Sequence, residues 1–242
     1  GDRLGRAYDR HSVRPFDMID GVAVIPIEGT LVQKGSWIGQ SSGETSYQGL
    51  QPQIARAGRD EVKGAVFEVD SFGGMVNGAF ETATSIRQLS ARKPTIAILT
   101  DFAYSAAYLL ASQCRQIIVP EFGGAGSIGV VTLHADWSEA LENEGIRVTI
   151  IHAGKHKVDG NPYEPLPEAV RAEWQARVEA IRERFAEVVG QGRGKRYSKA
   201  DALKSEAKSY EASEAARLGL VDAVGDPQEA FETFITEVNR RP

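Results

Sequence analysis

Short apolar segments alternate with helix-like segments along most of the chain, and this alternation constrains the fold more than any other feature. The segments with the apolar, β-branched character of strands are residues 22–27, 65–70, 95–99, 116–119, 130–134 and 148–151. Helices are predicted at three places between them, over residues 77–92, 105–114 and 138–144. Strands joined through helices run parallel, and the helices then cover both faces of the sheet. The sequence therefore predicts an α/β fold with a mostly parallel sheet.

Two local features qualify this pattern. Residues 29–49 are rich in Gly, Ser and Thr and predict a loop between the first two strands. Asn77 is the expected N-cap of the helix that runs to about Arg92.

The last part of the chain is predicted to be helical. Apolar side chains recur every three or four residues from Val170 to Val188, as on one face of a long amphipathic helix. Shorter helices are expected near residues 199–208 and 212–218, and a last one from about Pro227.

These patterns predict a simple domain organisation for the 242 residues. Residues 1–18 form a polar N-terminal arm, with Arg3, Arg6, Arg10 and Arg14 at helical spacing. Residues 19–242 form a single domain whose helical C-terminal part begins at about residue 167. The Gly- and Arg-rich residues 190–196 are the best candidate for a linker.

Composition excludes several classes of protein. The chain has 28 Lys and Arg against 33 Asp and Glu, a net charge of −5, which argues against nucleic-acid binding. The single cysteine, Cys114, cannot form a disulfide within the chain and fits a reducing compartment. No apolar stretch approaches the ~18–20 residues that span a bilayer, and no signal peptide is visible. We therefore expect a cytoplasmic protein without nucleic-acid or membrane partners.

Two motifs resemble ligand sites but lack the required context. Gly124, Gly126 and Gly129 match the dinucleotide fingerprint, which needs a helix directly after the glycines. A strand pattern follows instead, so a tight loop is predicted. His152 and His156 have the spacing of metal ligands on a helix, but Gly154 interrupts that turn and no metal site is expected.

Two other motifs can carry catalytic chemistry. Ser71-Phe-Gly-Gly74 follows a predicted strand, and is either a tight turn or a source of backbone N–H donors for an oxyanion. Ser105 also follows a strand and begins a helix. It is either an N-cap or a nucleophile, with the Ala106 N–H as a second oxyanion donor.

The general base is less clear from the residues. None of the four histidines lies in a sequence that indicates a Ser-His-Asp triad. Lys157 follows an apolar segment, and as a base it would need a pKa lowered by about 3 units from its ordinary value. Burial without a carboxylate partner can produce such a shift.

Taken together, the motifs resemble the protease IV or signal peptide peptidase A family, serine peptidases related to the Clp protease and crotonase fold. The matching segments, in order, are Asp70–Gly74, Tyr104–Tyr108, Gly126–Val130, His156–Pro162 and Ala215–Asp222. The resemblance implies a Ser–Lys dyad of Ser105 as nucleophile and Lys157 as base, with Ser127 orienting the lysine. It also implies an oxyanion site formed by Gly74, beside Gly73, and by Ala106, and it implies no cofactor.

The chain departs from the family pattern at two places. Phe72 stands where the family usually has Pro, and Ala106-Ala107 where it usually has Gly-Gly, which bears on substrate preference. The variant motifs resemble the branch of tailed phages and prophages, whose head-maturation proteases cleave scaffold, portal or capsid proteins. That branch implies protein substrates, action in the host cytoplasm or procapsid, and a homo-oligomer with shared active sites. A housekeeping peptide hydrolase and a catalytically inactive structural ring component are the alternatives.

Overall fold

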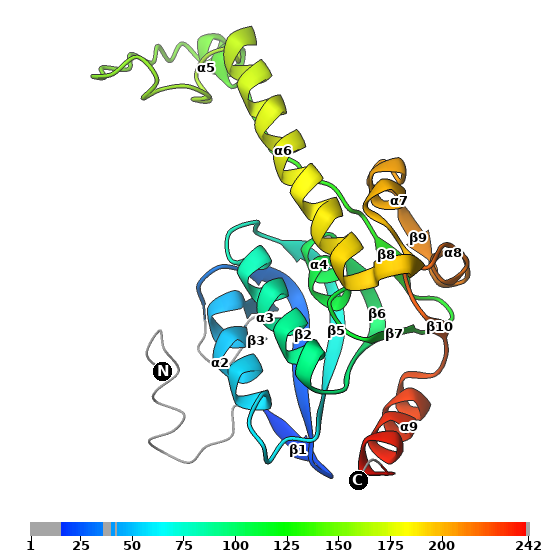
Figure 1. Ribbon diagram of the computed structural model, residues 1–242. Coiled ribbons are helices and arrows are strands. Elements are labelled where there is room, and N and C mark those ends of the chain that lie inside the picture. Colours follow the sequence, from blue (N-terminus) through cyan, green and yellow to red (C-terminus); the bar gives the residue numbers. More distant parts are fainter. Residues whose placement is uncertain (1–15, 36–39, 42, 241–242) are drawn as a thin grey trace, which may run out of the picture. The chain divides into compact units, whose positions relative to one another are not determined.

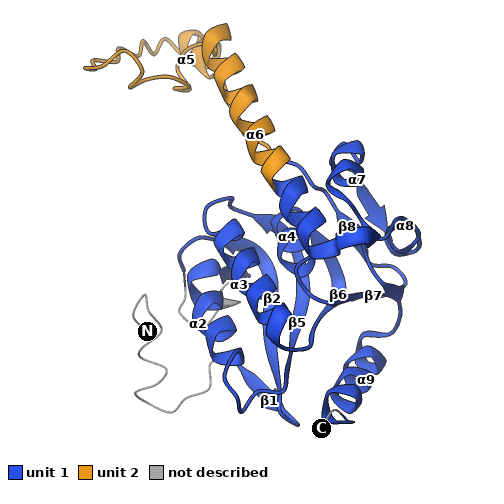
Figure 2. Ribbon diagram, viewed as in Figure 1, with its two compact units in different colours: residues 1–129, 185–242 blue, residues 130–184 orange. Residues whose placement is uncertain are grey.

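A computed structural model describes residues 16–35, 40–41 and 43–240 of the chain. The chain divides into two compact units, one of residues 1–129 with 185–242 and one of residues 130–184 (Figure 2). Helix α6 (Glu168–Arg193) contributes residues to both. The single peptidase domain over 19–242 stays a prediction.

The predicted strands of the first unit form one mostly parallel sheet. Its central strands are β2 (Val22–Val32), β5 (Gly64–Gly74), β6 (Thr95–Tyr104) and β7 (Gln116–Val119). The shorter strands are β1 (Asp17–Ile19), β3 (Gln40–Ser41), β4 (Glu44–Ser46), β8 (Gly124–Gly126), β9 (Ser209–Glu211) and β10 (Ala223–Val224). Among the described residues the order is β10-β7-β6-β5-β2-β4-β3, with β1 beside β2 and β8 between β6 and β9. Pairing is antiparallel only at β1–β2, β3–β4 and β8–β9, so the predicted mostly parallel sheet is confirmed.

Alternate side chains of the strands enter two separate apolar clusters. Ile25 and Ile27 of β2 lie in the cluster that also holds α2 (Tyr47–Ala57), α3 (Ala79–Arg92) and α4 (Ala106–Ala111). Val22 of the same strand lies in a smaller cluster with Phe234 of α9 (Pro227–Arg240). Figure 1 shows α2 and α3 over one face of the sheet and α9 over the other. The second face is covered only in part, because Phe72 at the carboxyl end of β5 is 69% exposed.

The predicted loop over residues 29–49 is wrong at both of its ends. β2 continues to Val32, and α2 begins at Tyr47. Ser46 is the N-cap of α2, accepting a hydrogen bond from the Gly49 N–H at 3.1 Å. Gly and Ser therefore form a bulge and a helix cap here. In composition alone, such a segment looks like a loop.

Two further local predictions are wrong. Helix α3 has the left-handed Gly78 as its N-cap, with no side-chain cap bond, so Asn77 does not cap it. Residues 190–196 are no linker, because α6 continues to Arg193 and a 3₁₀ turn (Gly194–Arg196) follows. The helices predicted near residues 199–208 and 212–218 are confirmed as α7 (Lys199–Lys204) and α8 (Ala212–Leu218).

The described residues include only the last part of the predicted N-terminal arm. Residues 1–15, with the four arginines, lie outside the described residues. Phe16 is buried, and Asp17–Ile19 pair with β2 as β1.

The second unit contains α5 (Ser138–Asn143) and the first part of α6, as predicted, but no strand among its residues. The strands predicted over 130–134 and 148–151 are therefore wrong. Their apolar side chains are exposed instead, with Val131 at 90% and Ile151 at 95%. A strand pattern gives a strand only where another strand is available to pair with it.

Within the described part of the chain, no helix has both the length and the apolar character that crossing a bilayer requires.

Candidate active site

Ser105 occupies a strained turn between a strand and a helix. It follows Tyr104, the last residue of β6, and precedes Ala106, the first residue of α4. Its backbone has φ 53° and ψ −126°, a region that costs a residue other than glycine about 1–3 kcal/mol. Its side chain makes no cap hydrogen bond, so Ser105 is not an ordinary N-cap. Nucleophilic serines of α/β hydrolases occupy the same kind of strained turn, which exposes the hydroxyl.

Gly73 brings the end of β5 against this turn. Its φ is +99°, and a Cβ placed on it would lie 2.7 Å from Ser105 Cβ and 2.9 Å from Ala106 N. Any side chain at this position would therefore push the Ser105 turn away. The Gly73 N–H already donates a hydrogen bond to Ser71 Oγ at 3.0 Å. Of the three predicted oxyanion residues, Gly74 and Ala106 are therefore the better candidates to donate an N–H to the oxyanion.

Gly74 lies at the last position of β5, where β6 no longer pairs with it. The β5–β6 register ends at Ser71 opposite Ala103. On the other edge, the Met75 N–H donates to Leu31 O at 2.8 Å. Because successive N–H groups of an extended strand point to opposite edges, the Gly74 N–H points to the edge that β6 leaves at Ser105. Gly74 must also be glycine, since a Cβ there would lie 2.0 Å from Leu31 O.

Ser71 lies at the candidate site, although sequence reasoning gave it no role. Its side chain is buried, and its hydroxyl donates to Gly29 O at 2.5 Å while accepting from the Gly73 N–H. Gly29 lies where β2 bulges out of register with β5. The hydroxyl therefore connects two strands and fixes the glycine pair. Its place in the Ser71–Gly74 motif was the available signal.

Strand β8 brings Ser127 next to Ser105. Gly126 pairs in register with Tyr104, and the Ser105 N–H donates to Gly126 O at 3.0 Å. Ser105 directly follows Tyr104 and Ser127 directly follows Gly126, so each serine comes next after one member of this pair. Ser127 also has a positive φ, 55°, and its N–H donates to Lys208 O at 3.0 Å. Gly124–Gly126 is a strand rather than a loop, and no helix follows it to form a dinucleotide site.

The late motif Ala215–Asp222 supports the helix that begins after Ser105. The Tyr108 hydroxyl of α4 donates to Leu220 O at 2.8 Å, and burial raises the pKa of Tyr108. Gly219 must be glycine, because it has φ +87° and a Cβ would lie 2.0 Å from Arg196 O. Two motifs that are far apart in the sequence therefore pack together at the helix that follows Ser105.

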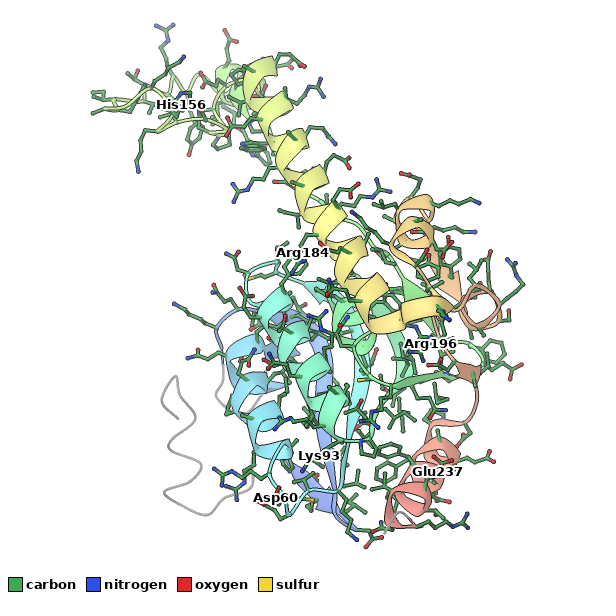
Figure 3. The ribbon with its side chains drawn as sticks, viewed as in Figure 1. Asp60, Lys93, His156, Arg184, Arg196 and Glu237 are labelled. Carbon is green, nitrogen blue, oxygen red and sulfur yellow. The ribbon has the colours of Figure 1, made fainter. Side chains whose placement is uncertain are left out.

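Asp222 ends this motif in a network of ion pairs. It accepts from both terminal nitrogens of the fully buried Arg193, at 2.9 and 3.0 Å. Arg196 donates to it at 2.7 Å, and the Ile117 N–H at 2.7 Å (Figure 3 labels Arg196). Burial favours the neutral carboxyl of Asp222 and would raise its pKa. The pKa is nevertheless held below its ordinary value by the hydrogen bonds and charge of Arg193, and by the hydrogen bonds from Arg196 and from the Ile117 N–H.

Lys157 belongs to the second unit. It lies in a turn, with its N–H donating to Gly154 O at 3.1 Å, and its side chain is exposed. The turn is followed by Gly160, where a Cβ would lie 2.2 Å from the Trp174 ring of α6. The dyad of Lys157 with Ser105 stays a prediction, as does the orienting role of Ser127.

The histidines near Lys157 make local contacts. His156, labelled in Figure 3, pairs through Nδ1 with Asp159 Oδ2 at 2.8 Å. His152 Nδ1 lies 3.0 Å from Gly154 O, and His134 Nε2 lies 2.9 Å from Asn161 O. Among the residues that the structure describes, no group of three or more His, Cys, Asp or Glu side chains could hold a metal ion.

The sequence is similar to those of known phage and bacterial proteins. Capsid assembly protease C of Escherichia phage lambda is 38% identical over 229 residues, which are 94% of this chain and 52% of the relative. Head-tail preconnector protein GP5 of Enterobacteria phage P21 is 36% identical over 235 residues, 96% of this chain and 46% of the relative. Protease 4 of Haemophilus influenzae is 27% identical over 247 residues, 99% of this chain and 38% of the relative. The chain thus spans about half the length of the two phage relatives.

The fold and the family agree with these relatives. A mutant of the 1510-N membrane-bound stomatin-specific protease has the same fold, with a TM-score of 0.56 at 16% identity, over 90% of this chain and 84% of that one. Residues 87–240 match Peptidase family S49. The resemblance to protease IV and signal peptide peptidase A is thereby confirmed, and the chain belongs to peptidase family S49.

Proposed function

We propose that this chain is the peptidase part of a head-maturation protease of a phage or prophage, which cleaves scaffold, portal or capsid proteins. The observation that carries the catalytic part is the strained Ser105 turn with Gly73 packed against it. The two phage relatives, one called a capsid assembly protease and the other a head-tail preconnector protein, support the substrate class. The site of action is then the host cytoplasm or the procapsid.

The reaction is acyl transfer from the peptide to Ser105. Lys157 takes the proton of the Ser105 hydroxyl as Oγ bonds to the scissile carbonyl carbon. The N–H groups of Gly74 and Ala106 hold the oxyanion of the tetrahedral intermediate. The carbon–nitrogen bond then breaks, and Lys157 returns the proton to the leaving amine. Water hydrolyses the acyl-enzyme by the same steps in reverse, and Ser127 holds the lysine amine toward Ser105.

We also propose that the active enzyme is a homo-oligomer in which Ser105 and Lys157 come from neighbouring protomers. The support lies in the second unit, where Val131, Leu133 and Ile151 are 85–95% exposed although their sequence has the pattern of strands. Exposed apolar surface of this kind is typical of an interface. The apolar stripe of α6 contributes less than its sequence suggests, because Phe185 and Val188 pack in the core of the first unit.

Complementation tests the shared site. Ser105→Ala and Lys157→Ala chains with different tags are co-expressed, and heteromers carrying both tags are purified. Each single variant is expected to be inactive, while the heteromers regain part of the activity because some interfaces combine an intact Ser105 with an intact Lys157. Inactive heteromers would place the whole dyad within one chain.

The substrate class is tested by co-expression with candidate scaffold, portal and capsid proteins, followed by mass spectrometry of the new termini. Cleavage at defined sites by the wild-type chain, and none by Ser105→Ala, is the expected result. Cleavage of short unstructured peptides alone would favour the housekeeping hydrolase. Absence of any Ser105-dependent cleavage would favour a structural component.

A further inference from the structure

A group of three aromatic rings, one exposed and two half-buried, lies on the sheet face that α9 covers in part. Ser71 and Ala103 are paired in register and buried, and Ala103 lies in the large cluster beneath the helices. Because side chains alternate across a strand, Phe72, Phe102 and Tyr104 face the opposite side. Among the described residues, Phe234 and Val238 of α9 pack on that side over the other end of the strands. We call Phe72, Phe102 and Tyr104 the aromatic platform.

The three rings of the aromatic platform contact one another. The ring centroids of Phe72 and Phe102 are 5.3 Å apart, those of Phe102 and Tyr104 5.3 Å, and those of Phe72 and Tyr104 5.8 Å. These separations are in the favourable range for aromatic pairs, so the rings form one continuous surface. Phe72 nevertheless remains 69% exposed, and an exposed apolar patch of this kind marks a place where something binds.

The aromatic platform is continuous with the candidate active site. Phe72 directly precedes Gly73, and Tyr104 directly precedes Ser105. Consecutive Cα atoms are about 3.8 Å apart, so the Tyr104 ring begins one residue from Ser105 and the Phe72 ring two residues from Gly74. The Tyr104 hydroxyl reaches β8, where a Cβ on Gly124 would lie 2.1 Å from it. The platform therefore lies on β5, which ends at Gly74, and on β6, which Ser105 follows. It also reaches β8, which Ser127 follows.

The platform is close in sequence and in space to the point where a peptide would meet Ser105. An extended chain advances about 3.3 Å per residue, so the platform is within reach of side chains one or two positions from the scissile bond. The edge of the platform is acidic, because Asp101 directly precedes Phe102 and Glu211 pairs in register with Gly124, beside the Tyr104 hydroxyl. An acidic side chain would be repelled there.

We propose that the aromatic platform is a specificity subsite, which binds a large apolar, preferably aromatic, side chain of the substrate within two residues of the scissile bond. The proposal rests on the peptidase function proposed above. Phe72 contributes most of the open ring surface, at the position where the family usually has Pro.

Cleavage-site mapping tests the subsite. The wild-type chain, Phe72→Ala and Phe122→Ala are each incubated with a peptide library from a digested proteome, and the cut sites are identified by mass spectrometry. Phe122 is a matched control, because it is 88% exposed and takes part in none of the ring contacts found among the described residues. We expect wild type and Phe122→Ala to enrich aromatic and large aliphatic residues at one position near the cut, and Phe72→Ala to lose this enrichment.

The preference is then measured on two peptides that differ only by Phe or Ala at that position. The ratio of their kcat/KM values is expected to be roughly tenfold for wild type and Phe122→Ala, and to fall close to one for Phe72→Ala. An unchanged ratio in Phe72→Ala would overturn the subsite. So would a Phe72→Ala variant that changes subunit number while keeping its preference, because the platform would then be a contact between protomers.

A binding measurement separates failure of the subsite from failure of the proposed function. Fluorescence anisotropy of the same two peptides, labelled, is followed with the Ser105→Ala chain and with the Ser105→Ala, Phe72→Ala double variant. Tighter binding of the Phe peptide that depends on Phe72 supports the subsite even if Ser105 proves not to be the nucleophile. Equal binding of both peptides to both variants overturns the subsite even if Ser105-dependent cleavage is observed.

Discussion

The two units hold the predicted catalytic residues in opposite ways. In the first unit Ser105, Gly73 and Ser127 have strained or left-handed backbones, and each is fixed by contacts with neighbouring strands. In the second unit Lys157 lies in an exposed turn, in a region whose apolar side chains are also exposed. The backbone strain of the first unit is maintained by its own core, whereas the second unit has surface that its own residues do not cover.

This difference agrees with the proposed homo-oligomer, in which the first unit forms its part of the site alone and the second unit is covered by a neighbouring protomer. The nucleophile and the oxyanion donors of a peptidase must be pre-organised, which requires rigid strands and close backbone packing. A lysine base must instead lose solvent to become neutral, so an exposed Lys157 needs a further surface to cover it. The predictions below test each side of this comparison.

Replacement of Lys157 should have the largest effect. Lys157→Ala and Lys157→Arg should each lower kcat/KM by several orders of magnitude, because alanine has no amine and a guanidinium does not deprotonate. His156→Ala is the matched control and should keep most of the activity, since His156 pairs locally with Asp159. Steady-state cleavage assays provide the measurement. An inactive His156→Ala with an active Lys157→Ala would replace the dyad by a Ser–His arrangement.

Gly73→Ala should be the next most damaging change. The new Cβ would lie 2.7 Å from Ser105 Cβ, so the turn must shift, and a displacement of that kind costs roughly 100-fold in kcat. Gly194→Ala is the control, because Gly194 also has a positive φ, +61°, but nothing lies within 4 Å of the added Cβ. Both variants should lose about 1 kcal/mol or more of stability in urea unfolding. Equal activity of the two would show that Gly73 does not position Ser105.

Ser71→Ala should have a smaller effect on activity. It removes the hydroxyl that accepts from the Gly73 N–H, so we expect roughly a tenfold fall in kcat with little change in KM. Ser90→Ala is the control, since its buried hydroxyl also donates to a carbonyl, Gln113 O, at 2.8 Å. Each variant should lose about 1–2 kcal/mol of unfolding free energy. A kcat that falls equally in both would make Ser71 merely structural.

Asp222→Ala should affect stability rather than chemistry. It leaves the fully buried Arg193 without its carboxylate, at an expected cost of about 3 kcal/mol in unfolding free energy at pH 7. The folded-state pKa of Asp222 is lowered, so its contribution is complete above the unfolded value of about 3.9. That contribution is lost as the pH falls through the lower folded-state pKa. Urea unfolding at pH 7 and pH 3 should therefore give a smaller difference between wild type and variant at pH 3, and a constant difference would contradict the ion pair.

Local pattern was sufficient to predict much of this molecule. The strands over 65–70, 95–99 and 116–119 and the long helix from Val170 to Val188 are confirmed, because buried apolar runs and a helical stripe are local signals. The strands over 130–134 and 148–151 failed for a physical reason. Their pattern is suitable for a strand, but the described residues of the second unit provide no strand to pair with them.

The geometry around the predicted site residues could not be read from the sequence. Motif order identified Ser105, Gly73 and Gly74, whereas the placement of Gly73 within β5 and the role of Ser71 depend on how β2, β5 and β6 fall out of register. Bulges of this kind leave little trace in the sequence. The aromatic platform likewise exists only because β5 and β6 lie side by side, which brings Phe72 to Phe102.

The central claim is that Ser105 is a nucleophile whose reactivity depends on Lys157. Intact-protein and peptide mass spectrometry after reaction with a serine-directed peptidyl phosphonate tests it most directly. We expect one adduct per chain, located on Ser105, and no adduct in Ser105→Ala or Lys157→Ala. An adduct on another residue, or an unmodified Ser105 in a preparation that cleaves peptides, would contradict it.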